Sequence, residues 1–301
     1  MQQSGAVCEF TNSDSWVILS PIEQSIKRKI EAVGTPLKDW DINIYRGVLT
    51  GYNEAFIIST EKREEILANC HSEDERKRTA ELIRPILRGR DIKRYGYNWA
   101  GLYLIATFPS RHYDIEQYPA VKEYLLSFGI ERLEQTGKVH NVNGEKVKAR
   151  KKTSNKWFET QDSISYWEDF SKPKVMWKII GCNINFSFDE TNKICNNAVD
   201  IMTGKRSQLL QFVGLMNSKL FDWYLKLTTE AEVQGGGIQL YVTTLEKTLL
   251  KLDFPNVLND VVEKRLNALC SDEDVDNIIF TLYGITSEEK SFINSCRQVN
   301  R

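Results

Sequence analysis

The spacing of apolar and polar residues predicts a chain that mixes helices and strands. Ser20-Pro21-Ile22-Glu23 has the serine, proline and glutamate positions that begin a helix, and apolar residues then alternate with polar ones at Ile42 and Ile44. Further along, Gly101–Thr107 is rich in strand-forming residues and predicts a central strand. The first third of the chain is therefore expected to contain both kinds of element.

The run from Arg46 to Ile58 predicts two short apolar strands joined by a tight polar turn. The turn residues are Thr50-Gly51-Tyr52-Asn53, with apolar residues on both sides. Glycine tolerates the backbone angles of tight turns, and such a turn can present backbone N–H groups and small side chains to a ligand. We therefore expect a strand pair here with a polar loop at its tip.

The middle of the chain predicts helices followed by an irregular basic stretch. A polar helix is expected from Glu61 to Asn69 and a second from Ser72, until Pro85 turns the backbone. Residues 119–135 have the apolar spacing of an amphipathic helix, whereas residues 137–156 have neither a helical nor a strand period. The basic stretch therefore predicts a long loop or a hairpin.

The second half predicts a strand meander and then helices. Three apolar runs, at residues 175–179, 184–188 and 198–202, predict three consecutive strands. Residues 206–227 are apolar on nearly every side, which predicts a buried helix pair that Gly235-Gly236-Gly237 ends. From about residue 257 the chain is expected to be helical. The whole order predicts an α+β fold, with a mixed β-sheet, packed helices and a C-terminal helical segment.

Charge is balanced over the chain but not along it. There are 40 lysines and arginines against 41 acidic residues, which argues against a protein that coats DNA through a large positive excess. Residues 138–156 and 84–94 are nevertheless strongly basic, whereas the acids gather in residues 61–75 and 271–289. This segregation predicts one positive face on a neutral body.

The cysteine and histidine patterns favour neither a zinc site nor a disulfide framework. The 6 cysteines are scattered without a CxxC pair, and the 3 histidines lie far apart in the sequence. The chain also has neither an apolar stretch of membrane-spanning length nor a signal-peptide pattern. We expect reduced thiols and a cytoplasmic protein without a metal site or a membrane partner.

Several separated motifs follow a known family pattern. Besides the turn run, they are Glu81–Tyr95, Tyr118–Leu125, Lys172–Trp177 and Leu215–Lys226. In this order they resemble the TaqI-like C-terminal specificity domain. That domain is the target-recognition part of adenine-specific DNA methyltransferases and of fused (type IIG) restriction-modification enzymes. The resemblance implies double-stranded DNA as the ligand, in a bacterial or archaeal restriction-modification or phage-defence system.

The catalytic motifs of such enzymes are missing from the sequence. An adenine methyltransferase needs an Asn/Asp-Pro-Pro-aromatic loop, and no Pro-Pro occurs here. The glycine cluster follows a helix, whereas a cofactor cradle needs glycines between a strand and a helix. We therefore expect a chain that is not an enzyme by itself and binds no cofactor. The resemblance implies that S-adenosylmethionine, with Mg²⁺ where DNA is cleaved, belongs to a separate methyltransferase or nuclease domain or subunit.

Three segments are expected along the chain. Residues 1–19 look like a tail or linker from a missing upstream domain, residues 20–255 form the DNA target-recognition domain, and residues 256–301 form the C-terminal helical segment. That last segment also suits another function, a protein-docking module for a methyltransferase or nuclease subunit with little DNA contact of its own. A nuclease is a third alternative, but its nearest motif, Glu145-Lys146-Val147-Lys148, lacks a partner acid on a strand.

One group of candidate DNA contacts lies in the shared motifs. Members of such a family read different DNA sequences, so the residues that they share should hold the DNA backbone and not the bases. A guanidinium suits that task because it binds phosphate in a bidentate way. Asn53 has a simpler explanation as a turn-stabilising side chain, and Arg90 as an ion-pair partner of Asp91. The residues of this group are Thr50, Asn53, Arg88, Arg90 and Lys93.

A second group lies in the basic stretch, which is the segment expected to differ among family members. Arginine and lysine read guanine and asparagine reads adenine, so these side chains carry the groups needed for base contacts. The alternatives are a solvated loop with no DNA contact, or readers in residues 183–197. The residues of this group are Lys148, Arg150, Lys151, Lys152 and Asn155.

Overall fold

The computed structural model describes residues 19–228, 232–233, 237–251 and 254–296. Two compact units make up the chain. We call residues 42–209 and 235–239 the sheet unit, and residues 1–41, 210–234 and 240–301 the helical unit. This division differs from the expected limits after residues 19 and 255, because the first helix belongs to the same unit as the C-terminal helices.

The first sheet of the sheet unit is antiparallel and has the strand order β10-β8-β12-β2. The three predicted apolar runs of the second half do form strands, but they do not form a meander. β12 pairs with β8 and not with β10, because the chain between β10 and β12 first joins the other sheet as β11. The strands are β2 (Ile42–Arg46), β8 (Lys174–Lys178), β10 (Phe186–Asp189) and β12 (Val199–Gly204).

The second sheet is mixed and has the order β11-β4-β5-β3, with β11 and β4 parallel. The predicted central strand is confirmed as β5, which lies between β4 and β3. Pro85 lies inside β4, so the helix before it gives way to a strand and not to a turn. The strands are β3 (Ile57–Ser59), β4 (Ile83–Leu87), β5 (Leu102–Ile105) and β11 (Ile194–Cys195).

The strand pair predicted around Thr50 is wrong. β2 belongs to the first sheet and β3 to the second, and Asn53–Phe56 forms a short helix, α2, between them. The apolar side chains of this run reach a shared core only when β3 pairs with β5, whose Leu104 lies opposite Ile57. Burial of apolar surface against distant strands therefore decided this pairing, and not the local turn.

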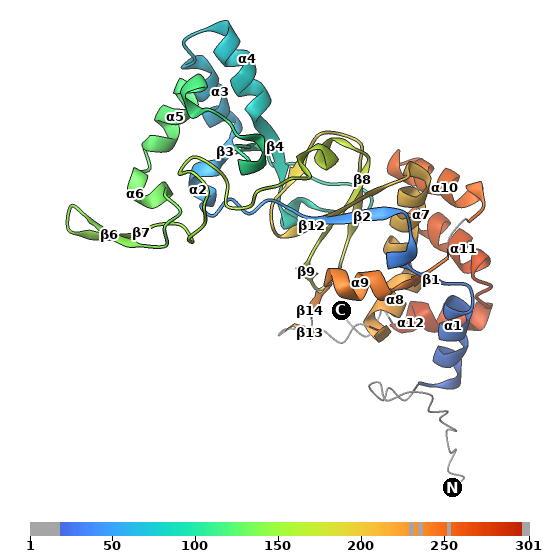
Figure 1. The fold of residues 1–301 in the computed structure, drawn as a ribbon. Coiled ribbons are helices and arrows are strands. Elements are labelled where there is room, and N and C mark those ends of the chain that lie inside the picture. The colour runs from blue at the N-terminus through green and yellow to red at the C-terminus, as the bar shows by residue number, and fades with distance from the viewer. Residues whose placement is uncertain (1–18, 229–231, 234–236, 252–253, 297–301) are drawn as a thin grey trace. The chain divides into compact units, whose positions relative to one another are not determined.

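Helices pack beside the second sheet: α3 contacts β3, α4 contacts β4, and α5 packs against α3 (Figure 1). The two helix starts predicted here are confirmed, with Ser59 and Ser72 as N-caps. Gly129, at a φ of 84°, divides the predicted helix of residues 119–135 in two. The helices are α3 (Thr60–Ala68), α4 (Glu73–Leu82), α5 (Pro119–Leu126) and α6 (Ile130–Leu133).

The basic stretch forms a two-stranded hairpin, so the hairpin alternative is confirmed. β6 (Val139–Val142) pairs antiparallel with β7 (Glu145–Lys148). Asn143 and Gly144 have φ angles of 53° and 87°, as a two-residue type I′ turn requires at both central positions. A second small ladder pairs β9 (Ile180–Gly181) with β14 (Gly237–Gln239).

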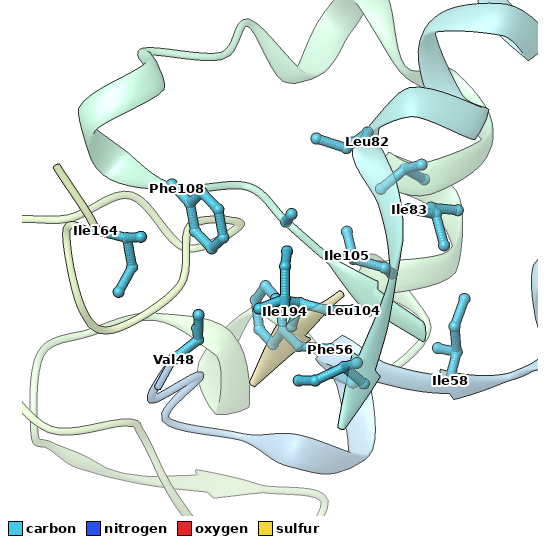
Figure 2. Packing of buried hydrophobic residues seen from close by; sticks show 14 of the residues in the cluster. Val48, Phe56, Ile58, Leu82, Ile83, Leu104, Ile105, Phe108, Ile164 and Ile194 are labelled. Atoms are coloured by element: carbon cyan, nitrogen blue, oxygen red, sulfur yellow. The ribbon is translucent and has the colours of Figure 1, made fainter. Parts of the chain in front are cut away.

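The core of the sheet unit gathers apolar side chains from both sheets. Figure 2 shows Phe56, Leu104 and Ile194 close together within this cluster. All three are fully buried, and they come from α2, β5 and β11. Met176 of β8 and Ile201 of β12 belong to the same cluster, so the two sheets share one core.

The two sheets meet where the backbone after β2 crosses the backbone after β11. Gly47 N–H donates to the Val199 carbonyl (2.8 Å) and Val48 N–H to the Cys195 carbonyl (2.7 Å). A Cβ on Gly47 would lie 2.0 Å from the Asn196 carbonyl oxygen, so only glycine allows this approach.

The helical unit confirms the helices predicted at both ends of the chain. Ser20 and Glu23 form the capping box of α1. The Lys29 ammonium lies 2.6 Å from the buried Glu289 carboxylate, which also accepts from the Ser25 hydroxyl (2.8 Å), so α1 is tied to α12. The helices are α1 (Pro21–Glu31), α7 (Arg206–Asn217, which begins in the sheet unit), α8 (Lys219–Thr228), α9 (Val242–Lys247), α10 (Asn256–Leu266), α11 (Asp272–Leu282) and α12 (Ser287–Cys296).

Short strands complete the helical unit. β1 (Thr35–Pro36) pairs antiparallel with β15 (Leu249–Leu250), and β13 spans Glu232–Val233. The predicted break at residues 235–237 and the expected tail of residues 1–19 lie almost entirely outside the described residues. With many helices beside several sheets, one of them mixed, the α+β prediction is confirmed.

In the described part of the chain, no helix has both the length and the apolar composition needed to cross a bilayer.

Candidate functional site

A cavity of about 880 Å³ lies in the sheet unit and is lined by residues of both sheets. Its lining comes from the end of β2, from the turn after β4, from the end of β8 and from the link between β11 and β12. The crossing at Gly47 brings these four segments together. The polar lining residues are Arg46, Asn53, Glu54, Arg88, Arg90, Lys178, Asn196, Asn197 and Gln239.

The cavity is positively charged. Glu54 is the acidic residue in its lining, against three arginines and a lysine. Arg88 is neutralised by the buried Asp91, which its Nε and Nη2 approach at 3.1 and 2.9 Å. Asp91 therefore pairs with Arg88 and not with Arg90, and Arg90 is exposed.

The cavity lining also carries side-chain amides. Asn53 Oδ1 accepts from the Thr50 hydroxyl (2.7 Å), which leaves the amide nitrogen of this exposed side chain available. Asn196 Oδ1 accepts from the backbone N–H of Ala198 at 3.3 Å. Amides offer both a donor and an acceptor, so this lining can bind a polar ligand as well as an anion.

The structure brings together three of the predicted contacts, Asn53, Arg88 and Arg90. Thr50 is fully buried, and its hydroxyl stabilises the turn. The hydroxyl donates to Asn53 Oδ1 and accepts from the Tyr52 backbone N–H. Lys93 is exposed beside this region, with its ammonium 3.0 Å from the Arg90 carbonyl.

The basic-stretch residues do not line this cavity. Lys148 lies on β7, and Lys151 and Lys152 follow it; all three are exposed. The Asn155 amide donates to the carbonyls of Thr160 and Gln161 at 3.2 and 2.9 Å, so its side chain stabilises a loop.

Arg150, a predicted DNA-base contact, is instead buried and bonds to the protein backbone. Its side chain is 3% exposed and lies over the Phe56 ring, 5.0 Å from the ring centre. Burial lowers its pKa to about 10, which still leaves it charged at neutral pH. The guanidinium donates four hydrogen bonds of 2.6–2.9 Å to backbone carbonyls, those of Leu133, Thr50, Glu159 and Trp157.

Arg46, Lys178 and Gln239 line the cavity although the sequence did not single them out. Arg46 and Lys178 are the last residues of β2 and β8, and both strands flank β12. The sequence does show a basic residue at the end of each of these strands. This feature could not indicate a shared site without the knowledge that β2 and β8 belong to one sheet.

A buried carboxyl lies behind the cavity. Asp200 on β12 is opposite Arg46 on β2, is 2% exposed, and has an Oδ1 atom without a hydrogen-bond partner among the described residues. Burial raises the pKa of Asp200 to about 6, although the Arg46 charge opposes this shift. This carboxyl is therefore ionised at neutral pH at a cost to stability.

The fold and the basic cavity define a polar-ligand module with an α+β core. The family model of the TaqI-like C-terminal specificity domain matches residues 84–248, more than half of the 301-residue chain. The chain therefore belongs to this family, and the resemblance seen in its motifs is confirmed.

Two solved structures share the fold. The type IIG restriction endonuclease BpuSI is similar at a TM-score of 0.50 and 14% identity, over 82% of this chain and 27% of that one. The type IIL restriction-modification enzyme MmeI, solved in complex with DNA, is similar at 0.53 and 12% identity, over 88% of this chain and 36% of that one. The chain thus spans roughly a third or less of these enzymes. A search among curated proteins found no match.

Replacing Arg150 should mainly lower the stability of the protein, because this side chain bonds to its own backbone. Arg150→Ala removes four hydrogen bonds to backbone carbonyls, of which that of Glu159 keeps the Gln135 amide as a donor, and we expect the free energy of unfolding in urea to fall by about 3 kcal/mol. Arg150→Lys should recover only part of this, because one ammonium cannot reach all four carbonyls. The neighbouring exposed Lys151→Ala is the control, with an expected change within about 0.5 kcal/mol. An Arg150→Ala protein of unchanged stability would contradict the structural role.

Asp200 should make stability fall as the pH rises from about 4 to about 7. In that range the unfolded carboxyl, with a pKa of about 3.9, ionises first, while the folded one keeps its proton up to about pH 6. The folded state then binds more protons, so this group lowers the free energy of unfolding as the pH increases.

Asp200→Asn removes that contribution. Urea unfolding at a series of pH values should show that the variant gains stability over the natural protein between pH 4 and 7, with a constant difference above. Asp39→Asn, at an exposed aspartate, serves as the control for the loss of a carboxyl group. A difference between the Asp200 variant and the natural protein that does not change with pH would refute the proposed ionisation.

Proposed function

We propose that this chain is the DNA target-recognition module of a restriction-modification enzyme and that its basic cavity holds the DNA backbone. The observation that carries the proposal is the excess of basic side chains in this cavity, three arginines and a lysine with Glu54 as the acid in the lining, in a chain of the TaqI-like specificity family. Arg46, Arg90 and Lys178 suit phosphate oxygens, and the amides of Asn53 and Asn196 suit sugar or base edges. The DNA-bound state of the similar MmeI structure agrees with this assignment.

The hairpin of β6 and β7 is the proposed base reader. Its register places Val139 opposite Lys148 and Asn141 opposite Lys146, so these four side chains share one face. Asn141, Lys146 and Lys148 are all exposed on that face. A two-stranded ribbon fits the major groove of B-DNA, where asparagine pairs with adenine and lysine with guanine.

The enzyme to which the module belongs would methylate adenine, through a methyltransferase part outside this chain. Such an enzyme must extrude the target base, because the adenine amino group is not accessible within the duplex stack. The module would then fix the position of the DNA by its backbone and bases while the catalytic part acts. This division of labour accounts for a sequence that lacks the Pro-Pro loop and the cofactor turn.

The chain alone should neither bind S-adenosylmethionine nor transfer a methyl group. Titration calorimetry with S-adenosylmethionine should give no heat of binding, and radiolabelled methyl transfer to duplex DNA should stay at background. A methyltransferase of the same kind, measured in parallel, controls for cofactor quality. Micromolar binding of the cofactor by this chain would overturn its assignment as a non-catalytic module.

Cavity and hairpin substitutions should separate affinity from specificity. Arg46→Ala and Lys178→Ala should weaken binding to all duplexes alike, and each lost phosphate contact should reduce the salt slope by about 0.9. Asn141→Ala, Lys146→Ala and Lys148→Ala should cost about 1–3 kcal/mol, but only on the preferred sequence.

The measurement is a binding profile over a randomised DNA library at several salt concentrations, with the module joined to its catalytic part. Lys77→Ala, an exposed lysine of α4 that lines neither cavity nor hairpin, is the control and should change neither quantity. If the hairpin variants lose affinity uniformly and the cavity variants change the preferred sequence, the two roles are reversed. An affinity that does not respond to salt would favour the docking alternative.

A further inference from the structure

We propose that a second cavity of the sheet unit is a binding site for a phosphate group. It measures about 350 Å³ and shares no lining residue with the first cavity. Three arginines line it, Arg78 from α4, Arg84 from β4 and Arg111 from the turn after β5. Arg84 precedes Arg88 by four residues along an extended strand, which corresponds to about 13 Å.

The three guanidinium groups have only neutral partners. Arg84 Nη2 donates to the Ser171 hydroxyl (3.0 Å) and to the Asn192 carbonyl (2.9 Å). Arg78 Nη2 donates to the Gln117 carbonyl (3.2 Å), and its buried Nε has no partner among the described residues.

Arg111 is the most accessible of the three. Its guanidinium stacks on Trp167, 3.8 Å from the ring centre, which holds the group flat. Stacking uses the face of the guanidinium and leaves its N–H groups free to point at an anion.

The charges of this cavity are not balanced. Glu81 is the acid in the lining, against three arginines. Burial lowers the pKa of Arg84, and the neighbouring Arg111 lowers it further, whereas Tyr113 opposes the shift. Like charges held together without a counter-ion cost free energy, and a bound anion would recover it.

A phosphate group matches this arrangement in charge and in geometry. Planar guanidinium groups bind its oxygens in pairs, and Tyr113, Tyr118 and Ser171 add hydroxyl groups to the lining. The cavity is too small for a duplex but large enough for one phosphate with its attached group. The phosphate can come from the backbone of bound DNA or from a small phosphorylated molecule.

The first test uses the full chain and sodium pyrophosphate as the probe, in calorimetric titrations at constant ionic strength. The natural protein should bind saturably, and Arg111→Ala should weaken binding by about tenfold, the loss expected for one charge-assisted contact. Arg111 is exposed and stacks on the surface, so its removal should leave the fold intact, which circular dichroism checks. Arg76→Ala, an exposed arginine on the same α4 helix, is the matched control. Equal binding by all three proteins, or none by the natural one, overturns the proposal.

The second test identifies the source of the phosphate with duplex DNA. If Arg111→Ala lowers DNA affinity and its salt slope, and pyrophosphate competes with DNA, the site holds the DNA backbone. If DNA affinity is unchanged while pyrophosphate binding is lost, the site serves a small phosphorylated ligand. Both results support a phosphate site. If the chain binds pyrophosphate at Arg111 but binds no DNA, the proposed function is wrong and the phosphate site is supported.

Discussion

The hydrogen bonds of the buried Arg150 guanidinium are the interaction on which the Thr50 turn and the β6–β7 hairpin depend. A charge inside a protein is tolerated only when its hydrogen bonds are satisfied, and Arg150 satisfies four of them with backbone carbonyls. Those carbonyls belong to three segments: α6, the turn at Thr50, and the loop of residues 157–159. The turn that carries Asn53 into the cavity and the base of the β6–β7 hairpin are therefore fixed by the same side chain.

A second constraint joins the two sheets. The backbone crossing at Gly47 and Asn196 has no room for a side chain, and it places the ends of β2 and β8 beside the turn after β4. Residues more than a hundred positions apart then line one cavity. Because the strands share one core, the backbone positions of their ends are fixed by the fold.

Charged side chains in the sheet unit are either paired in the core or gathered in the two cavities. In the first sheet, the Lys174 ammonium lies 2.5 Å from the Asp189 carboxylate, and both are buried, so this pair stabilises the structure without presenting charge. Both cavities, in contrast, are lined by three arginines each and by a single acidic residue, Glu54 in the first and Glu81 in the second. A chain with nearly equal numbers of acids and bases can thus hold strongly positive sites, because its acids lie elsewhere.

The sequence by itself determined the features that depend on neighbours a few residues away. The capping box at Ser20 and the N-cap at Ser72 follow from local hydrogen bonds, and both appear in the structure. The family motifs and the α+β class were also visible. Only the tertiary structure decided which strands pair, that the run around Thr50 enters two sheets, and that Arg150 is buried while Arg46 and Lys178 face a cavity. These outcomes depend on apolar burial and backbone contacts between residues far apart in the chain, which no local pattern specifies.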